Sequence, residues 1–191
     1  MQMAGPRVEL RPFVRADLDA VHAFAADPVV TRYTDWGPND AAASNAFIEL
    51  ACARRAPDGD VIWAVTRRDN RHVIGSAAVT IESRIHGRAQ FGYALARSAW
   101  GQGYATEAAR LLVSFAFRDL SVHRLTATCH PENTASVRVL QKAGLSLEGR
   151  LRDHLLVGGV RRDSLLFSVI AHNAPRRQAP RGHDVADVPG A

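Results

Sequence analysis

The chain has 191 residues, of which 47% are hydrophobic and 23% charged. This composition is that of an ordinary globular protein and excludes a disordered or fibrous one. Cys52 and Cys129 lie far apart in the sequence, so neither a zinc site nor a disulfide framework is expected. The chain contains no run of about 18 apolar residues, and Met1 to Pro6 lacks the pattern of a signal peptide. We therefore expect a cytoplasmic protein that does not span a membrane.

The formal net charge is +5, which favours acidic partners but reports on association rather than on fold. We expect a solvated basic surface rather than a nucleic-acid interface, and either a monomer or a homodimer. Residues 1–172 contain no internal repeat or linker and are predicted to form a single domain. Residues 173–191 are rich in proline and arginine, so we predict a disordered basic tail.

The first half of the chain predicts one strand, two helices and an antiparallel meander of three strands. The Asp27-Pro28 pair is expected to end the first helix. In chain order these elements are Val8–Arg11, Asp17–Ala26, Asp40–Arg55, Val61–Thr66, Val73–Glu82 and Ala89–Ala96.

The second half predicts a helix, a strand, a second helix and a hairpin. Asn133 is expected to cap the second helix, and Gly158-Gly159 to form the hairpin turn. The elements are Gly103–Phe117, Arg124–Cys129, Asn133–Gly144, Leu145–Val157 and Arg162–Ile170. Together the elements predict an α/β fold, with a mixed, mostly antiparallel central sheet of about seven strands flanked by about four helices.

The most informative segment, WGQGYATEA, runs from Trp100 to Ala108 between a strand and a helix. Glycines in such a turn let backbone N–H groups and the helix dipole converge on an anion such as a phosphate. A plain strand-to-helix turn is the alternative.

Two other phosphate-binding loops fit less well. A kinase-type loop needs a Lys-Ser/Thr pair after its last glycine, but the only lysine, Lys142, precedes Ala143, so this pattern is absent. A dinucleotide fingerprint needs a third small residue where Thr106 stands, and a place near the start of a parallel sheet.

This segment resembles the cofactor loop of the GNAT superfamily of N-acyltransferases, whose pattern is Q/R-x-x-G-x-G/A. Gly103 and Ala105 occupy its last two fixed positions, whereas Trp100 stands where Gln or Arg is usual. The strings FGYAL, PENTAS and KAGL add a resemblance to the RimJ and RimL type acetyltransferases, which acetylate N-terminal amines of ribosomal proteins. The resemblance covers Val8 to Ala171 and implies the GNAT fold.

The resemblance implies acetyl-CoA as the cofactor. Loop residues would hold the pyrophosphate, a neighbouring strand would pair with the pantetheine arm, and two cations would meet the nucleotide phosphates unless they are only surface charges. In that order these residues are Gly101, Gln102, Gly103, Tyr104, Ala105 and Thr106; Tyr93, Ala94, Leu95 and Ala96; and Arg138 and Lys142. An N–H of the strand is expected to stabilise the oxyanion.

Asn133 and Ser136 match the N-x-x-S pattern of this branch. The resemblance implies that the serine protonates the departing sulfur and that the asparagine helps to hold the cofactor arm. The alternative is that Asn133 is only a helix cap and Ser136 an ordinary first-turn residue. Glu107 is expected to orient the loop helix from its first turn.

A general base is harder to find. Related sequences often have glutamate before the F/I-G-Y segment, but here the residue is Gln90, which cannot accept a proton at neutral pH. Glu82, His86, His130 and Glu132 remain as candidates, and each also fits a surface or loop role. A site with a weak base favours an α-amine with a pKa near 8 over a lysine amine with a pKa near 10.4.

We therefore predict direct acetyl transfer to a protein N-terminal α-amine. Tyr33 and Trp36 match an aromatic region that lines the acceptor pocket in this branch, or they pack in the core; Glu82 and Gln90 are the other acceptor-side candidates. A small-molecule amine (antibiotic, polyamine or amino acid) is the alternative acceptor. A CoA-binding or nucleic-acid-binding module without catalysis is a third possibility. The histidines show no metal-ligand spacing, so no metal is expected.

Overall fold

The computed structural model describes residues 1–53 and 61–171. Within these ranges the strands are β1 (Met3–Ala4), β2 (Val8–Pro12), β3 (Val61–Arg67), β4 (Val73–Ser83), β5 (Arg88–Leu95), β6 (Arg124–Cys129), β7 (Ser146–Val157) and β8 (Val160–Ile170). The α-helices are α1 (Leu18–Ala25), α2 (Pro28–Thr31), α3 (Ala41–Ala53), α4 (Tyr104–Arg118) and α5 (Thr134–Lys142). The predicted tail, and the end of the helix predicted to reach Arg55, lie outside the described residues.

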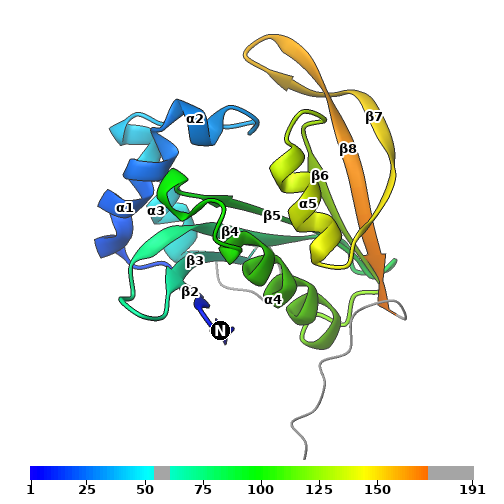
Figure 1. The fold of residues 1–191 in the computed structure, drawn as a ribbon, viewed down its shortest axis with the longest axis horizontal. Coiled ribbons are helices and arrows are strands. Elements are labelled where there is room, and N and C mark those ends of the chain that lie inside the picture. Colours follow the sequence, from blue (N-terminus) through cyan, green and yellow to red (C-terminus); the bar gives the residue numbers. More distant parts are fainter. Residues whose placement is uncertain (54–60, 172–191) are drawn as a thin grey trace, which may run out of the picture.

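The strands form one sheet in the order β1-β2-β3-β4-β5-β6-β8-β7 (Figure 1). The predicted α/β fold with a mostly antiparallel sheet is confirmed. The described part of the chain has eight strands and five α-helices rather than about seven and four. The additional strand, β1, has only two residues, too few for an alternating pattern to predict.

The additional helix, α2, arises from the pair that was expected only to end α1. The Asp27 carboxylate accepts the N–H of Val29 at 2.8 Å, and Pro28 occupies the first turn. Proline is well suited to that position because an N–H in the first turn of a helix has no partner within the helix, so nothing is lost when proline lacks one. The same two residues therefore end one helix and begin the next.

Helices cover both faces of the sheet. On one face Trp63 of β3 packs edge-to-face against Phe115 of α4, with ring centroids 5.0 Å apart and planes at 82°. On the other face α1 and α3 bury a second cluster that includes Phe13, Phe24 and Ile48. Both aromatic and aliphatic burial stabilise this three-layer arrangement.

The centre of the sheet opens between β5 and β6. These strands are parallel and pair only over Arg88–Gln90 and Arg124–Thr126, whereas the other neighbouring pairs of the described sheet are antiparallel. Beyond Gln90, β5 continues with β4 and β6 continues with β8. The two strands therefore diverge (Figure 1), and we call the space between them the opening.

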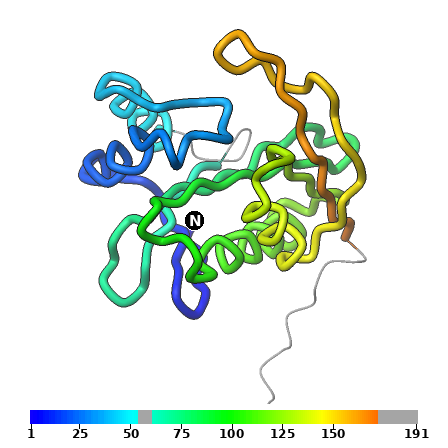
Figure 2. The backbone as a smooth tube through the Cα atoms, turned by 45° about the horizontal axis from the view of Figure 1, so that its top comes forward, coloured from blue at the N-terminus to red at the C-terminus, as the bar shows by residue number. Residues whose placement is uncertain are grey.

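The β7–β8 hairpin turns through Gly158-Gly159, as predicted. Both glycines have positive φ, +56° and +80°, as a two-residue turn that matches the strand twist requires. Figure 2 shows this hairpin (yellow to orange) and the α1–α3 region (blue to cyan) on opposite sides of the molecule. Arg162 of β8 donates to the carbonyl of Arg32 at 3.2 Å, so the segment after α2 reaches across to the hairpin.

Candidate active site

Backbone groups line the inner edge of β5. The N–H of Ala96 donates to the carbonyl of Ile74 in β4 at 2.8 Å. Successive residues of a strand direct their N–H and C=O groups to opposite edges, so those of Leu95 and Tyr93 face the opening. Only alternate residues of the predicted 93–96 segment are therefore available to an extended ligand, and Ala94 and Ala96 are not among them. Such an edge is suited to pairing with the amides of an extended arm.

Trp100 bonds to the last residue of β5, at the wide end of the opening. Its Nε1–H donates to the Leu95 carbonyl at 2.8 Å, while 46% of the residue remains exposed. The Gln or Arg usual at this position of the pattern would also offer a side-chain N–H donor. The departure from the pattern thus retains a donor.

The loop between β5 and α4 has the geometry of an anion site. Gly101 and Gly103 adopt positive φ, +72° and +82°, which glycine does without strain. The Gln102 side chain donates to the Ser98 carbonyl at 2.8 Å and braces the turn. Gly103 is the N-cap of α4, and no side chain caps it. The N–H groups of Tyr104–Thr106 and the positive end of the helix dipole are therefore available to a phosphate.

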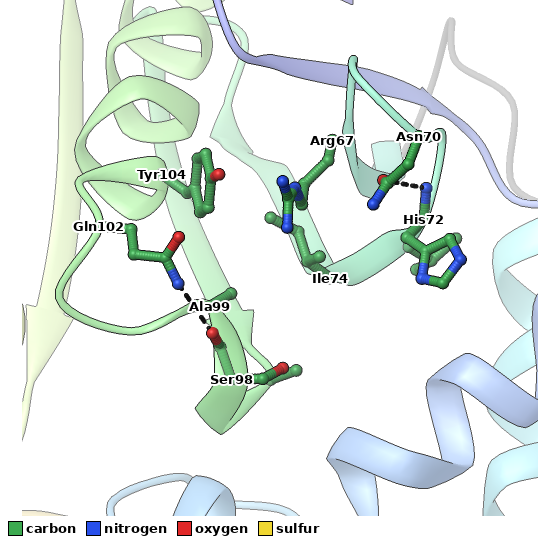
Figure 3. Close-up of a pocket in the computed structure, with 10 residues that line it drawn as sticks. Arg67, Asn70, His72, Ile74, Ser98, Ala99, Gln102 and Tyr104 are labelled. Atoms are coloured by element: carbon green, nitrogen blue, oxygen red, sulfur yellow. Dashed lines mark hydrogen bonds between the residues drawn. The ribbon is translucent and has the colours of Figure 1, made fainter.

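A cavity of about 160 Å³ lies on the β4 side of this loop. Figure 3 shows Arg67 and Tyr104 facing each other across it. The lining residues are Arg67, Asn70, His72, Val73, Ile74, Ala96, Ser98, Ala99, Gln102 and Tyr104. It shares two loop residues with the candidate anion site but contains neither Tyr93 nor Ser136.

The first turn of α5 meets β5 across the opening. The side chain of Asn133 accepts the N–H of Ser136 at 3.1 Å, so the predicted cap is confirmed. The hydroxyl oxygens of Ser136 and Tyr93 lie 2.9 Å apart. Ser136 is therefore held by a helix cap on one side and by a phenol on the other.

Burial controls the ionisation of two groups near Ser136. It raises the pKa of Tyr93 to about 12, against a smaller lowering by the hydrogen bond with Ser136. Burial also raises the pKa of the Cys129 thiol. Both groups therefore keep their protons at neutral pH, and Cys129 lacks the thiolate character of a nucleophile.

The two predicted phosphate-binding cations lie on the exposed surface of α5. The side chains of Arg138 and Lys142 are exposed and one turn apart. The carbonyl of Lys142 accepts two bonds from the Arg110 guanidinium, at 3.1 and 2.9 Å. Arg110 thus fixes the end of α5 to α4, which the sequence pattern did not predict.

An aromatic pair marks the end of β6. The rings of Tyr33 and His130 stack with centroids 5.0 Å apart and planes at 25°, and the Arg32 guanidinium lies 5.0 Å from the Tyr33 centroid. The Nδ1 of His130 accepts the N–H of Glu132 at 3.2 Å. A neutral His130 in this arrangement carries its proton on Nε2 and is a donor there.

The other acceptor-side candidates are spread apart. Gln90 is the last residue of β5 that pairs with β6, so it lies at the narrow end of the opening. Glu82 is exposed in β4, level with the paired residues Arg88 and Ala89 of β5, and His86 is exposed in the β4–β5 turn. Trp36 is 38% exposed in the segment after α2. Among the described residues, no group of three or more His, Cys, Asp and Glu side chains is placed to hold a metal ion.

Two contacts of this region were not predicted. The Tyr33–His130 stack joins residues about 100 positions apart, as does an ion pair between Arg7 and Glu107. Spacing rules link only neighbours along a helix or strand, so no local pattern in the sequence pointed to either pair.

Comparisons with known proteins decide the family. Residues 7–146 match the family model of the acetyltransferase (GNAT) domain. The chain belongs to the GNAT acetyltransferase family. It is 30% identical over 165 residues to the uncharacterized N-acetyltransferase p20 of Bacillus licheniformis, covering 86% of this chain and 93% of that protein.

Two further relatives differ in what their names say. Spermidine N(1)-acetyltransferase of Escherichia coli (strain K12) is 28% identical over 169 residues, covering 86% of this chain and 87% of that protein. The structure of Mycobacterium smegmatis RimJ, in complex with CoA-disulfide, superposes with a TM-score of 0.79 at 26% identity, covering 90% of this chain and 88% of that one.

Family membership makes the protein an N-acetyltransferase that uses acetyl-CoA. The free edge of β5 and the uncapped N-terminus of α4 fit an extended arm that ends in phosphates. None of the described helices has the length and apolar character needed to cross a membrane.

Proposed function

We propose that the protein acetylates the N-terminal α-amine of a protein by direct attack on acetyl-CoA. The observation that carries this proposal is the residue at the narrow end of the opening, Gln90, which is an amide rather than a carboxylate. At the end of β6, the Nδ1 of His130 accepts the N–H of Glu132. An α-amine is roughly a tenth neutral at pH 7, whereas a lysine amine is less than about a thousandth neutral. Only the α-amine can therefore react well without a strong base.

The residues of the opening have the following roles in this proposal. Acetyl-CoA supplies the acetyl group as a thioester, whose carbonyl carbon bonds to the neutral amine as the carbon–sulfur bond breaks. The loop at 101–106 holds the pyrophosphate, and Arg138 and Lys142 meet the nucleotide phosphates. The N–H groups of Tyr93 and Leu95, which face the opening, pair with the pantetheine arm and stabilise the oxyanion.

Two protons move in the reaction. Ser136 donates its proton to the departing thiolate and is reprotonated from solvent, while the proton released by the attacking nitrogen passes to water beside Gln90. Tyr93 stays protonated and holds the Ser136 hydroxyl through the bond of 2.9 Å. Asn133 positions the turn that carries Ser136. The amine approaches past Tyr33, Trp36 and His130.

A polyamine is the second candidate acceptor, because one relative is named a spermidine acetyltransferase. The charges near the aromatic pair weigh against it. Arg32 lies over Tyr33, and Arg162 bonds to the Arg32 carbonyl, so two guanidinium groups stand where a polycation would have to approach. Glu82, the acceptor-side carboxylate among the sequence candidates, lies level with the paired residues Arg88 and Ala89 of β5 and not in the opening.

An internal competition tests the proposal. A peptide with a free α-amine and one lysine is incubated with enzyme and acetyl-CoA, and fragmentation mass spectrometry locates the acetyl group. We expect acetylation at the N-terminus. Acetylation mainly at the lysine would refute the choice of α-amine. Binding of acetyl-CoA without acetylation of this peptide, of spermidine or of other amines would identify a binding module instead.

A further inference from the structure

Glu107, in the first turn of α4, fastens the start of β2 to the cofactor loop. Its Oε1 accepts the N–H of Arg7 at 2.7 Å and the N–H of Val8 at 2.9 Å. Its Oε2 lies 3.3 Å from Nε of Arg7. A Cβ added at Gly5 would clash with Glu107 Oε1 unless that carboxylate moved away from its present partners. The carboxylate thus bonds to β2 rather than only orienting its own helix.

Arg7 completes the connection from the other side. Its Nη1 donates to the carbonyl of Gln102 at 2.9 Å, and its guanidinium lies 5.1 Å from the centroid of the Tyr104 ring. A Cβ at Gly103 would lie 3.1 Å from Arg7 Nη2. Arg7 therefore contacts Gln102 and Tyr104, lies close to Gly103 between them, and is held itself by Glu107.

The bond to Gln102 determines where the next N–H points. In a trans peptide the carbonyl and the following N–H lie in one plane and point in opposite directions. Because Arg7 holds the Gln102 carbonyl, the N–H of Gly103 is directed to the opposite side of the loop. That N–H belongs to the set that precedes the first complete turn of α4 and is available to an anion.

The ion pair also removes a charge conflict. The Glu107 carboxylate lies in the first turn of α4, where an uncompensated negative charge would repel a pyrophosphate at the same helix terminus. Its side chain is only 13% exposed, so solvent screens it weakly. The adjacent guanidinium of Arg7 compensates this charge.

We propose that Arg7, together with Glu107, is a positioning pair that sets the affinity of the loop for the phosphates of CoA. The inference rests on the proposed placement of the pyrophosphate at residues 101–106 and is independent of the acceptor. Arg7 does not touch the reacting atoms. Its effect is on cofactor affinity and on the order of the loop.

Isothermal titration with CoA tests this pair in the full chain. Arg7→Met is expected to weaken CoA binding about tenfold, because a bond to a charged donor is lost and a carboxylate is left uncompensated. Glu107→Gln retains an oxygen for the backbone N–H groups but removes both the charge that holds Arg7 and the charge that would repel the phosphates, so these effects offset and CoA affinity is expected to stay within about threefold of native. The double variant Arg7→Met/Glu107→Gln is expected to recover part of the lost affinity. Arg15→Met, which removes an exposed charge paired with Glu49, is the matched control and is expected to change nothing.

Two readouts separate positioning from general damage. The amides of Gly101–Thr106 are expected to exchange hydrogen faster in cofactor-free Arg7→Met than in native protein. The KM for S-acetylpantetheine, which lacks the phosphates, is expected to stay within twofold. Equal weakening for CoA and S-acetylpantetheine, or CoA affinity within twofold of native in Arg7→Met, would overturn the proposal. If Arg7→Met does not fold, Arg7→Lys replaces it, with an expected loss of about threefold.

Gly101→Val distinguishes this inference from the cofactor placement on which it rests. A β-branched residue is strained at φ +72°, so the variant disturbs the loop without touching Arg7. Weaker CoA binding in Gly101→Val but not in Arg7→Met would refute the positioning pair alone. No weakening in either variant would refute the placement of the phosphates at the loop.

Discussion

The phenolic oxygen of Tyr93 lies 2.9 Å from the hydroxyl oxygen of Ser136, and this contact joins the inner edge of β5 to the first turn of α5. Tyr93 stays protonated because burial raises its pKa to about 12. Ser136 is therefore held in one place by a neutral partner that neither takes its proton permanently nor introduces a charge. That placement suits a residue that must deliver a proton to a sulfur atom in the opening.

Ser136→Ala is expected to lower turnover by 10²-fold or more, with little change in the KM for acetyl-CoA, because general acid catalysis contributes 10²–10⁴-fold. Thr134→Ala is the matched control, since Thr134 is an exposed hydroxyl residue in the same turn. Steady-state thiol release measures both. A loss of less than about threefold in Ser136→Ala would remove the acid role.

The raised pKa of Tyr93 predicts a specific dependence of stability on alkaline pH. A tyrosine in the unfolded chain ionises near pH 10, whereas Tyr93 in the folded protein retains its proton to about pH 12. Between these values the native state binds more protons, so the free energy of unfolding falls as pH rises. In Tyr93→Phe, which has no ionisable group at this position, this fall in the free energy of unfolding is absent.

Urea unfolding of both proteins at pH 8 and pH 10.5 measures the effect. Relative to Tyr93→Phe, native protein is expected to lose about 1 kcal/mol between these two pH values. An identical pH dependence in the two proteins would show that Tyr93 titrates normally.

Trp100 offers a test of the closed end of β5. Trp100→Phe removes the donor to the Leu95 carbonyl and is expected to lower the free energy of unfolding by about 1 kcal/mol. Trp100→Gln restores a side-chain N–H donor. Its free energy of unfolding is expected to fall by less than that of Trp100→Phe, although Trp100→Gln removes more apolar surface. Chemical denaturation ranks the two variants. The reverse order would show that the ring, rather than its N–H, stabilises the loop.

Gln90→Glu introduces the carboxylate that related sequences often have at this position. A base at the narrow end of the opening helps most with an amine that is mainly protonated at neutral pH. We expect the rate on a lysine ε-amine to rise about tenfold relative to the rate on an α-amine. Paired initial rates on an N-terminally blocked lysine peptide and a lysine-free peptide measure this ratio, and an unchanged ratio would show that Gln90 does not govern proton removal.

Local sequence patterns predicted most elements because each depends on neighbours along the chain. The alternation in β2, the glycine pair before β8 and the cap at Asn133 are examples. The pattern also placed Gly101 and Gly103 at the start of α4, where the structure has them with positive φ.

The features that sequence patterns did not predict depend on contacts between distant segments or on the register of neighbouring strands. The stack of Tyr33 on His130 and the bonds of Arg7 to Glu107 and Gln102 join distant segments. The loss of Ala96 as a pairing position follows from its bond to Ile74 in β4, which is visible only once the strand register is known.

The most direct measurement is the initial rate of acetyl-CoA-dependent thiol release with a lysine-free peptide that has a free N-terminus, compared with spermidine at equal concentration and pH 7. We predict rapid release with the peptide and little with spermidine, with the peptide signal lost in Ser136→Ala. Faster release with spermidine would contradict the proposed acceptor. Equal release by Ser136→Ala and native protein would contradict the proposed chemistry.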